Sequence, residues 1–187
     1  MFLRVCAIAL AACLSAAAPA FAALNVGDRA PAFTAQASLG GKVFSFDLAS
    51  ALKRGPVVLY FYPAAFTTGC TLEAHDFAAA ISQYKKLNAT VIGVSHDTID
   101  TLNKFSVSEC RSKFAVAADP ELAVAKSYDA VLPVAPQYAN RTSYVISQDG
   151  KIAYAYTNLN PGKHVQNTLD ALKQMKAKAK MRPVRSS

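Results

Sequence analysis

The residues most able to do chemistry lie in one short stretch, from Pro63 to Cys70. This stretch follows an apolar run over Val57–Tyr62, which is typical of a strand buried on both faces, and it precedes a segment with helical periodicity. Cys70 is therefore expected in the first turn of a helix, where unpaired N–H groups and the positive end of the helix dipole stabilise a thiolate. Because the thiolate is the reactive form of cysteine, this position predicts a nucleophile.

Two residues upstream of Cys70 suit the same chemistry. Thr67 carries a hydroxyl that can donate a hydrogen bond to a bound oxygen, and Pro63 fixes the backbone where the chain leaves the strand. Each residue also has a simpler interpretation. Thr67 could only cap the helix, Pro63 could only end the strand, and Cys70 could be a buried inert thiol.

The spacing Pro-x-x-x-Thr-x-x-Cys resembles the active-site loop of the peroxiredoxins, which are thiol peroxidases with a thioredoxin-like fold. The resemblance includes Glu73, Phe77 and Arg141, which opens the apolar stretch Thr142–Ile146, and the order of elements agrees from about Val26 onward. The sequence is most similar to the bacterioferritin-comigratory, or PrxQ-type, subgroup. Residue types, spacing and strand-to-helix context all agree, which makes the motif specific.

The resemblance implies a role for each residue of the motif. Cys70 attacks a peroxide and becomes a sulfenic acid. Thr67, loop N–H groups and Arg141 hold the two peroxide oxygens and stabilise the charge on the leaving oxygen. Glu73 orients Arg141 through a carboxylate–guanidinium pair, although Arg141 could instead form an ordinary surface salt bridge.

Cys110 is the second cysteine of the expected mechanism. In some PrxQ-type enzymes the resolving cysteine lies on the helix after the second buried strand, and the resemblance implies this role for Cys110. A disulfide requires two Cα atoms within about 7 Å of each other, so we expect local unwinding, which Ser106, Ser108 and Ser112 favour. The alternative is an unreactive Cys110, with Cys70 reduced directly by an outside thiol.

Two histidines need separate consideration. His75 stands where many PrxQ-type sequences have their resolving cysteine, five residues after the nucleophile. Five residues correspond to ~500° of helix, so the side chains of His75 and Cys70 lie ~140° apart and suit a metal poorly. We expect His75 at a surface or interface, and His96 either beside the site or in a structural role. The resemblance implies no metal, haem or flavin cofactor.

Strands and helices alternate along the chain before a closing hairpin. Apolar runs at Val57–Tyr62 and Thr90–Ser95 predict buried strands, while residues 70–87 and 98–110 predict helices. Gly40 and Gly41 predict one hairpin turn, and residues 148–151 predict another. Further helices are expected over 47–53, over 119–128 and from Gly162 onward. The order predicts an α/β protein with a mixed central β-sheet flanked by helices, and the resemblance implies that it is thioredoxin-like.

The 187 residues are enough for one well-filled domain. The chain begins with a short basic segment, an apolar stretch and an A-x-A site at Ala20–Ala22, which are the features of a secretory signal peptide. We expect a signal peptide over 1–22 with cleavage after Ala22, a domain over 23–172, and a basic helix end and flexible tail over 173–187. Leu10–Cys13 also fits a lipoprotein cleavage box. We favour the ordinary signal because Cys13 comes early and apolar residues continue past it.

Charge and cysteine content limit which disulfides and which binding partners are expected. Cys70 and Cys110 remain after cleavage, so an oxidising compartment permits at most one internal bridge. Six of the cations behind the net charge of +8 follow Asp170 with no acid among them. We expect a solvated helix end there, rather than a surface for nucleic acid or lipid. The protein is therefore expected to be periplasmic or secreted, with no nucleic-acid partner and no stable membrane association.

The sequence thus predicts a thiol-dependent peroxidase that reduces hydrogen peroxide and organic hydroperoxides. The expected reaction passes through a cysteine sulfenic acid and an intramolecular disulfide, and a thioredoxin-like reductant regenerates the enzyme. The resemblance also implies a monomer. Two alternatives are a thiol–disulfide oxidoreductase, which usually needs Cys-x-x-Cys where this chain has Glu73, and a non-catalytic thioredoxin-fold binding module.

Overall fold

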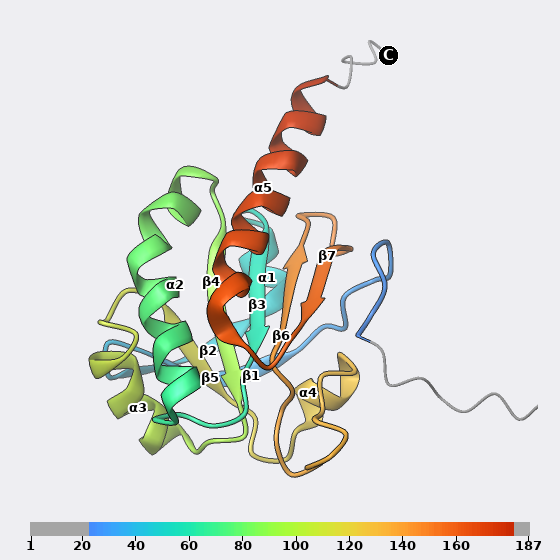
Figure 1. Ribbon diagram of the computed structural model, residues 1–187. Helices are drawn as coiled ribbons and strands as arrows, with labels where there is room; N and C mark the ends of the chain where they lie inside the picture. The colour runs from blue at the N-terminus through green and yellow to red at the C-terminus, as the bar shows by residue number, and fades with distance from the viewer. Residues whose placement is uncertain (1–22, 182–187) are drawn as a thin grey trace, which may run out of the picture.

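The computed structural model describes residues 23–181. Within them the strands form one mixed sheet in the order β2-β1-β5-β4-β3-β6-β7 (Figure 1). The strands are β1 (Thr34–Leu39), β2 (Lys42–Asp47), β3 (Val57–Phe61), β4 (Thr90–Ser95), β5 (Ala115–Ala118), β6 (Thr142–Ile146) and β7 (Ile152–Thr157). The helices are α1 (Leu48–Leu52), α2 (Thr68–Lys86), α3 (Ile99–Ser108), α4 (Ala123–Ser127), the 3-10 turn η1 (Pro161–Lys163) and α5 (His164–Met181).

Some sequence predictions lie outside the described residues. These are the signal peptide with its cleavage site, the alternative lipoprotein box, and the last residues of the basic tail, including Arg182 and Arg185. Among the residues that the structure describes, no helix combines the length and apolar character needed to cross a membrane.

Strand β3 lies near the middle of the sheet and organises the site. It pairs in parallel with β4 and antiparallel with β6, and every one of its residues is buried. A strand covered on both faces needs apolar side chains at every position, which is why the unbroken apolar run predicted it. The predicted bounds of β4, Thr90 and Ser95, are also confirmed.

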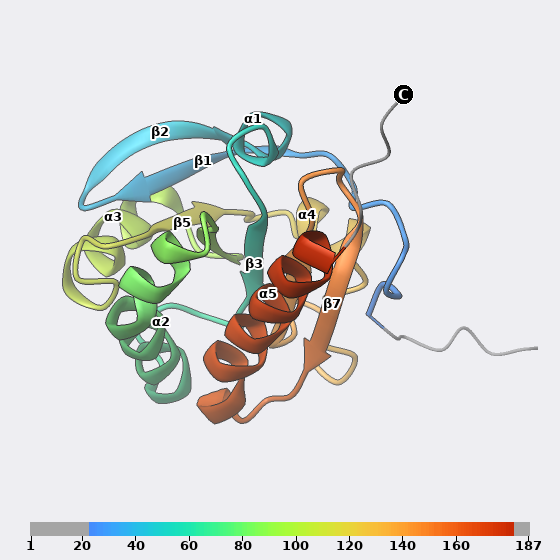
Figure 2. The same cartoon turned by 90° about the horizontal axis from the view of Figure 1, so that it is seen from above.

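The two faces of the sheet carry different helices. Figure 2 shows α2 and α5 on one face and α1 on the other, and the buried clusters place α3 with α2 and α4 with α1. Side chains alternate along β3, so Tyr60 belongs to the α2 side and Phe61 to the α1 side. Tyr60 stacks on Phe77 of α2 with ring centroids 4.3 Å apart. This aromatic contact holds α2 against β3.

Helix α2 begins two residues before the predicted start, with Thr67 at its N-cap position. Cys70 is consequently the third residue of the helix and lies in its first turn. Further along, the Tyr84 hydroxyl lies 2.7 Å from Thr168 Oγ1, which ties α2 to α5 in the interior. The buried Tyr84–Thr168 contact thus holds α2 in place at a position C-terminal to Cys70.

Two helix boundaries differ from the predictions. The predicted helix over 119–128 is wrong at its start, because Leu122 has a left-handed φ of 54° and α4 begins only at Ala123. The Asp119 side chain accepts hydrogen bonds from the N–H groups of Val124 and Ala125 and so caps α4 from a distance. Helix α3 ends at Ser108, so Cys110 follows that helix rather than lying on it.

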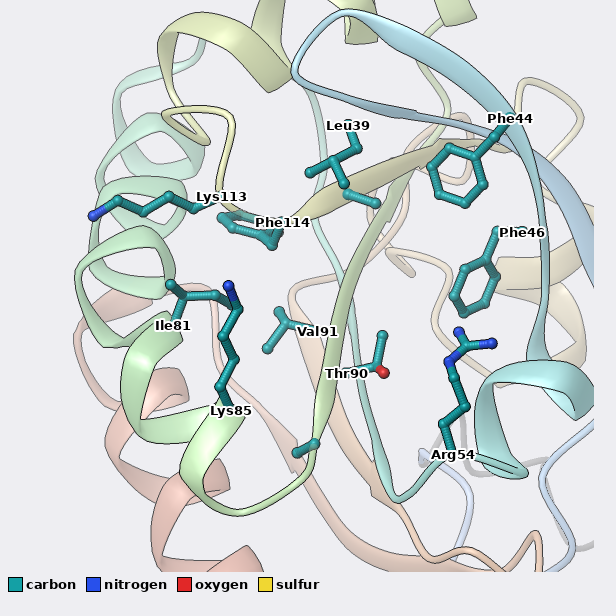
Figure 3. Close-up of a pocket in the computed structure, with 12 residues that line it drawn as sticks. Leu39, Phe44, Phe46, Arg54, Ile81, Lys85, Thr90, Val91, Lys113 and Phe114 are labelled. Carbon is teal, nitrogen blue, oxygen red and sulfur yellow. The ribbon is translucent and has the colours of Figure 1, made fainter.

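A groove lies near the C-terminal half of α2. Figure 3 shows Ile81 and Lys85 of α2 facing Leu39 and Phe44 of the β1–β2 hairpin across it, and its volume is about 380 Å³. No cysteine, histidine or carboxylate lines this groove. The groove therefore has no group for the predicted chemistry, which lies at the opposite end of α2.

Candidate active site

Cys70 lies where β3, the following loop and the start of α2 meet, at the lower end of α2 in Figure 1. Its side chain is buried, with only 2% of the residue exposed. Arg141 Nη2 donates to the Cys70 sulfur across 3.3 Å. A sulfur placed beside a guanidinium and in the first turn of a helix is stabilised in its charged form.

The sheet brings Arg141 to this place. Phe61, the last residue of β3, pairs with Thr142, the first residue of β6. Because these strands are antiparallel, the residue before β6 lies beside the end of β3 and the loop that leads to Cys70. Residues 71 positions apart in sequence therefore come into contact.

The Arg141 side chain is held at three nitrogen atoms. Besides the Cys70 contact, Nη1 donates to Glu73 Oε2, and Nε donates to the carbonyl oxygen of Leu159 across 2.8 Å. Burial lowers the pKa of Arg141, but the negative charges of Glu73 and Cys70 outweigh burial and the net shift is upward. Only 4% of Arg141 is exposed, so it forms a buried fork rather than a surface salt bridge.

Gly69 allows this close approach. A Cβ atom at position 69 would lie 3.1 Å from Arg141 Nη2. That is tighter than an ordinary van der Waals contact, so a side chain here would displace the guanidinium from Cys70. The sequence motif alone did not single out this glycine.

Glu73 is completely buried, one helical turn after Cys70. Burial raises the pKa of Glu73 to about 8, and the opposing effect of Arg141 does not cancel it. One carboxylate oxygen pairs with Arg141, as the family resemblance implied. The other, Oε1, has no hydrogen-bond partner and faces His164 Nδ1 at 3.6 Å.

Thr67 and Pro63 lie on the loop before α2. Thr67 is exposed, and its hydroxyl donates to the carbonyl oxygen of Ala64 across 2.9 Å, so its side chain makes no capping hydrogen bond to the helix. Pro63 is half-buried, and its carbonyl oxygen accepts from His96 Nδ1 across 2.8 Å. His96 therefore contacts the backbone of the loop that leads to α2.

Cys110 has a different environment. It is completely buried in the apolar cluster beneath α2 and α3. Burial raises the pKa of the Cys110 thiol far above its ordinary value, and the neighbouring Glu109 adds to this effect. Cys70 and Cys110 are both free thiols, so the structure shows the reduced form.

His75 is a residue of α2 and contacts the C-cap residue of α3. Its Nε2 is 2.8 Å from Glu109 Oε2, and its side chain is 35% exposed. The expectation of a surface or interface position fits this contact. Among residues 23–181, no group of three or more histidine, cysteine or carboxylate side chains is arranged to hold a metal ion.

Sequence reasoning missed His164. It is the first residue of α5 and is completely buried between Glu73 and Ser143. A single histidine at a helix start gives no local signal of burial. Only the packing of α5 against β6 reveals its position.

The sequence of this chain is similar to those of known proteins over most of its length. The family described as AhpC/TSA matches residues 26–155. This chain belongs to the AhpC/TSA family. The bcp protein of Helicobacter pylori is 34% identical over 154 residues, which cover 80% of this chain and 98% of that protein. The chloroplastic peroxiredoxin Q of Populus jackii is 32% identical over 156 residues, which cover 83% of this chain and 71% of that protein.

Solved structures of the family agree with the fold. The crystal structure of peroxidoxin BcpB from Mycobacterium tuberculosis matches with a TM-score of 0.73 and 27% identity, covering 80% of this chain and 97% of that one. The predicted thioredoxin-like fold with a mixed sheet is confirmed. The predicted membership of the peroxiredoxins, with similarity to the Bcp and peroxiredoxin Q proteins, is also confirmed, and the chain is a thiol-dependent peroxidase.

Proposed function

We propose that Cys70 is the nucleophile of this peroxidase. The observation that carries the proposal is the 3.3 Å contact between its sulfur and Arg141 Nη2 in the first turn of α2. The Cys70 thiolate attacks one peroxide oxygen, so an S–O bond forms while the O–O bond breaks. The sulfur is oxidised to a sulfenic acid, and the leaving hydroxide or alkoxide takes up a proton to become water or an alcohol.

Arg141 and Glu73 prepare the site for this step. Arg141 supplies the positive charge that stabilises both the thiolate and the negative charge developing on the leaving oxygen. Glu73 holds the guanidinium in place, because its Oε2 accepts a buried hydrogen bond from Arg141 Nη1. Thr67 contributes its hydroxyl when it turns from the Ala64 carbonyl to a bound peroxide, and Pro63 shields the loop side of the site.

Cys110 resolves the intermediate. Its thiol attacks the sulfenic sulfur of Cys70, a disulfide forms, and water leaves. Both thiols belong to the same buried apolar cluster, and this step brings their sulfurs together through a local movement of the turn that carries Cys110. The turn after α3 favours such a movement, because Arg111 and Ser112 both have left-handed φ angles, of 52° and 54°.

The remaining proposals concern the setting of the reaction. The substrates are hydrogen peroxide and small organic hydroperoxides, and a thioredoxin-like protein reduces the disulfide. The protein is exported after cleavage at Ala22 and acts as a monomer in the periplasm or outside the cell. The A-x-A site at Ala20–Ala22 supports export, and its test is the intact mass of the protein from the producing cell. A lipid-modified Cys13 would contradict this proposal.

Stopped-flow mixing of the reduced protein with hydrogen peroxide tests the role of Cys70. We expect Cys70 to react far faster than free cysteine, and the Cys70→Ser variant to be inert. A protein that instead exchanges rapidly with disulfides but slowly with peroxide would be a thiol–disulfide oxidoreductase. A protein slow with both would be a binding module.

Mass spectrometry after one equivalent of peroxide tests the role of Cys110. We expect a Cys70–Cys110 disulfide in the wild type, and a Cys70 sulfenic acid that over-oxidises readily in Cys110→Ser. If the wild type keeps the sulfenic acid while Cys110 stays free to alkylation, an outside thiol reduces Cys70 directly.

A further inference from the structure

His164 occupies a buried polar position behind the Cys70 site. Its Nε2 lies 2.8 Å from the carbonyl oxygen of Asn158, and its Nδ1 lies 2.8 Å from Ser143 Oγ. Because a carbonyl oxygen can only accept, Nε2 carries a hydrogen. In a neutral ring, Nδ1 is therefore the acceptor nitrogen: the Ser143 hydroxyl donates to it, and it also faces Glu73 Oε1 at 3.6 Å.

Without His164, one oxygen of the buried Glu73 carboxyl has no polar neighbour among the described residues that could share a proton with it. Its Oε2 accepts from Arg141, while its buried Oε1 has no hydrogen-bond partner in the described structure. A buried carboxylate oxygen without a partner is costly. A proton held between Glu73 Oε1 and His164 Nδ1 would remove this cost.

The net charge of the site also favours a proton on the Glu73–His164 pair. One guanidinium, Arg141, faces two acidic groups, the Cys70 thiol and the Glu73 carboxyl. With both acids ionised, a water-excluded site would carry one uncompensated negative charge, which is unfavourable. One proton on the Glu73–His164 pair makes the site neutral while Cys70 is a thiolate.

The surrounding groups do not supply a second positive charge. In the described part of the chain, the ion-pair contacts of Glu73 are those with Arg141 and His164. The other titratable groups near the pair are acids or phenols: Asp76 and Tyr84 on α2, Tyr60 on β3 and Tyr156 on β7. Burial raises the pKa of Glu73 to about 8 and lowers the pKa of His164 to about 4, which favours the proton on the carboxyl oxygen near neutral pH.

We propose that His164 is a positioning residue of the Cys70 site, which shares one proton with Glu73 as long as Cys70 is a thiolate. The proposal rests on the proposed role of Cys70. His164 thus acts on Cys70 through Glu73 and Arg141. A neutral Glu73 attracts Arg141 less strongly than a carboxylate does, so the guanidinium interacts more strongly with the thiolate and the peroxide. Loss of the shared proton at high pH puts a second anion beside Arg141 and weakens its effect on Cys70.

The pH profile of the peroxide reaction tests this role. The rate constant of Cys70 is measured by stopped flow in the wild type and in His164→Gln, whose amide cannot hold the proton. We expect the high-pH fall in rate to move to lower pH by about one unit, a tenfold change in proton affinity, because the neutral Glu73 carboxyl loses the nitrogen lone pair that disfavours its anion. His75→Gln is the matched control, since it removes another carboxylate-paired histidine, and it should keep the wild-type profile. A His164→Gln profile with the wild-type shape would overturn the proposal.

Nitrogen NMR of isotope-labelled histidine tests the proton directly and needs neither turnover nor a folded His164 variant. Spectra are compared between the reduced wild type and Cys70→Ser, in which the thiolate charge is absent and Glu73 alone faces Arg141. We expect the Nδ1 signal of His164 to shift between the two proteins, while those of His75 and His96 stay in place. An unchanged His164 signal would show a purely structural histidine. If Cys70 proves unreactive toward peroxide, the proposed function fails, and this spectrum still decides whether Glu73 and His164 share a proton.

Discussion

Cys70 and Cys110 are equally buried but have opposite surroundings. Cys70 is 2% exposed and Cys110 is not exposed at all, so water contact does not distinguish them. Cys70 lies in the first turn of α2 and receives a hydrogen bond from Arg141. Cys110 belongs to the same apolar cluster as Cys70, but it follows the end of α3 and lies next to the negative charge of Glu109. Burial stabilises the neutral thiol of Cys110, whereas Arg141 favours the thiolate of Cys70.

This difference separates two duties of a cysteine. A nucleophile toward peroxide must be ionised before the reaction, whereas a resolving thiol needs to react only after the first oxidation. Burial, together with the negative charge of Glu109, raises the pKa of the Cys110 thiol and keeps it from competing for peroxide. It also requires a local rearrangement before the second step, which ties resolution to movement of the turn after α3.

Removal of Arg141 should have the largest effect on the Cys70 side of the comparison. We expect Arg141→Ala to slow the reaction of Cys70 with hydrogen peroxide by roughly 10²–10³-fold, because one charge-assisted donor is lost. Arg141→Lys should recover only part of this loss, since an ammonium group cannot bridge Cys70 and Glu73 as the fork does. Stopped-flow kinetics measures both. A rate for Arg141→Ala within twofold of wild type would remove Arg141 from the mechanism.

The buried carboxyl of Glu73 should make the free energy of unfolding depend on pH. The folded pKa of Glu73, about 8, lies above its ordinary value of 4.5, so between these values the folded protein keeps a proton that the unfolded chain releases. Its stabilising contribution is complete below pH 4.5 and is lost as the pH rises through 8. His164, whose folded pKa of about 4 lies below its usual 6.5, acts in the opposite direction until the pH is about one unit above 6.5.

We therefore expect the free energy of unfolding of the reduced wild type to fall between pH 6.5 and 8, relative to Glu73→Gln. The limiting slope is about 1.4 kcal/mol per pH unit, because one proton is released. Urea titrations at several pH values give the two slopes. Parallel slopes for the two proteins would mean that Glu73 is already ionised in the folded state.

A methyl group at position 69 should give a smaller effect. In Gly69→Ala the new Cβ would approach Arg141 Nη2 to 3.1 Å and push it by a few tenths of an ångström. We expect roughly a tenfold loss of the peroxide rate constant, since misplacement of a catalytic group by 1 Å costs about 10². Thr68→Ala, an exposed substitution in the same turn, is the control and should retain the wild-type rate. Equal rates for the two variants would show that the site tolerates a shift of Arg141.

The Cys70 side of the comparison was largely predictable from sequence. The apolar run of β3, the start of α2 and the spacing from Cys70 to Glu73 are local features, and local physical rules govern them. Arg141 could be named from the family motif. The antiparallel pairing of β3 with β6 explains how it arrives.

The remainder depends on contacts between distant segments. His164 reaches Glu73 only because α5 packs behind β6, and the role of Gly69 appears only when Arg141 lies against it. The start of α4 was mispredicted because the Asp119 side chain replaces the first helical hydrogen bonds. The end of α3 before Cys110 likewise depends on left-handed residues that are not glycine, Arg111 and Ser112, which composition does not reveal.

The most direct test of the comparison is a pair of single-cysteine proteins. Reduced Cys110→Ser, which keeps Cys70, and reduced Cys70→Ser, which keeps Cys110, each receive one equivalent of hydrogen peroxide with a sulfenic-acid trap. The products are then assigned by mass spectrometry. We predict nearly complete trapping at Cys70 in the first protein and an unmodified Cys110 thiol in the second. Comparable oxidation of the two sulfurs, or oxidation of Cys110 alone, would contradict the claim that Arg141 and the start of α2 make Cys70 the reactive thiol.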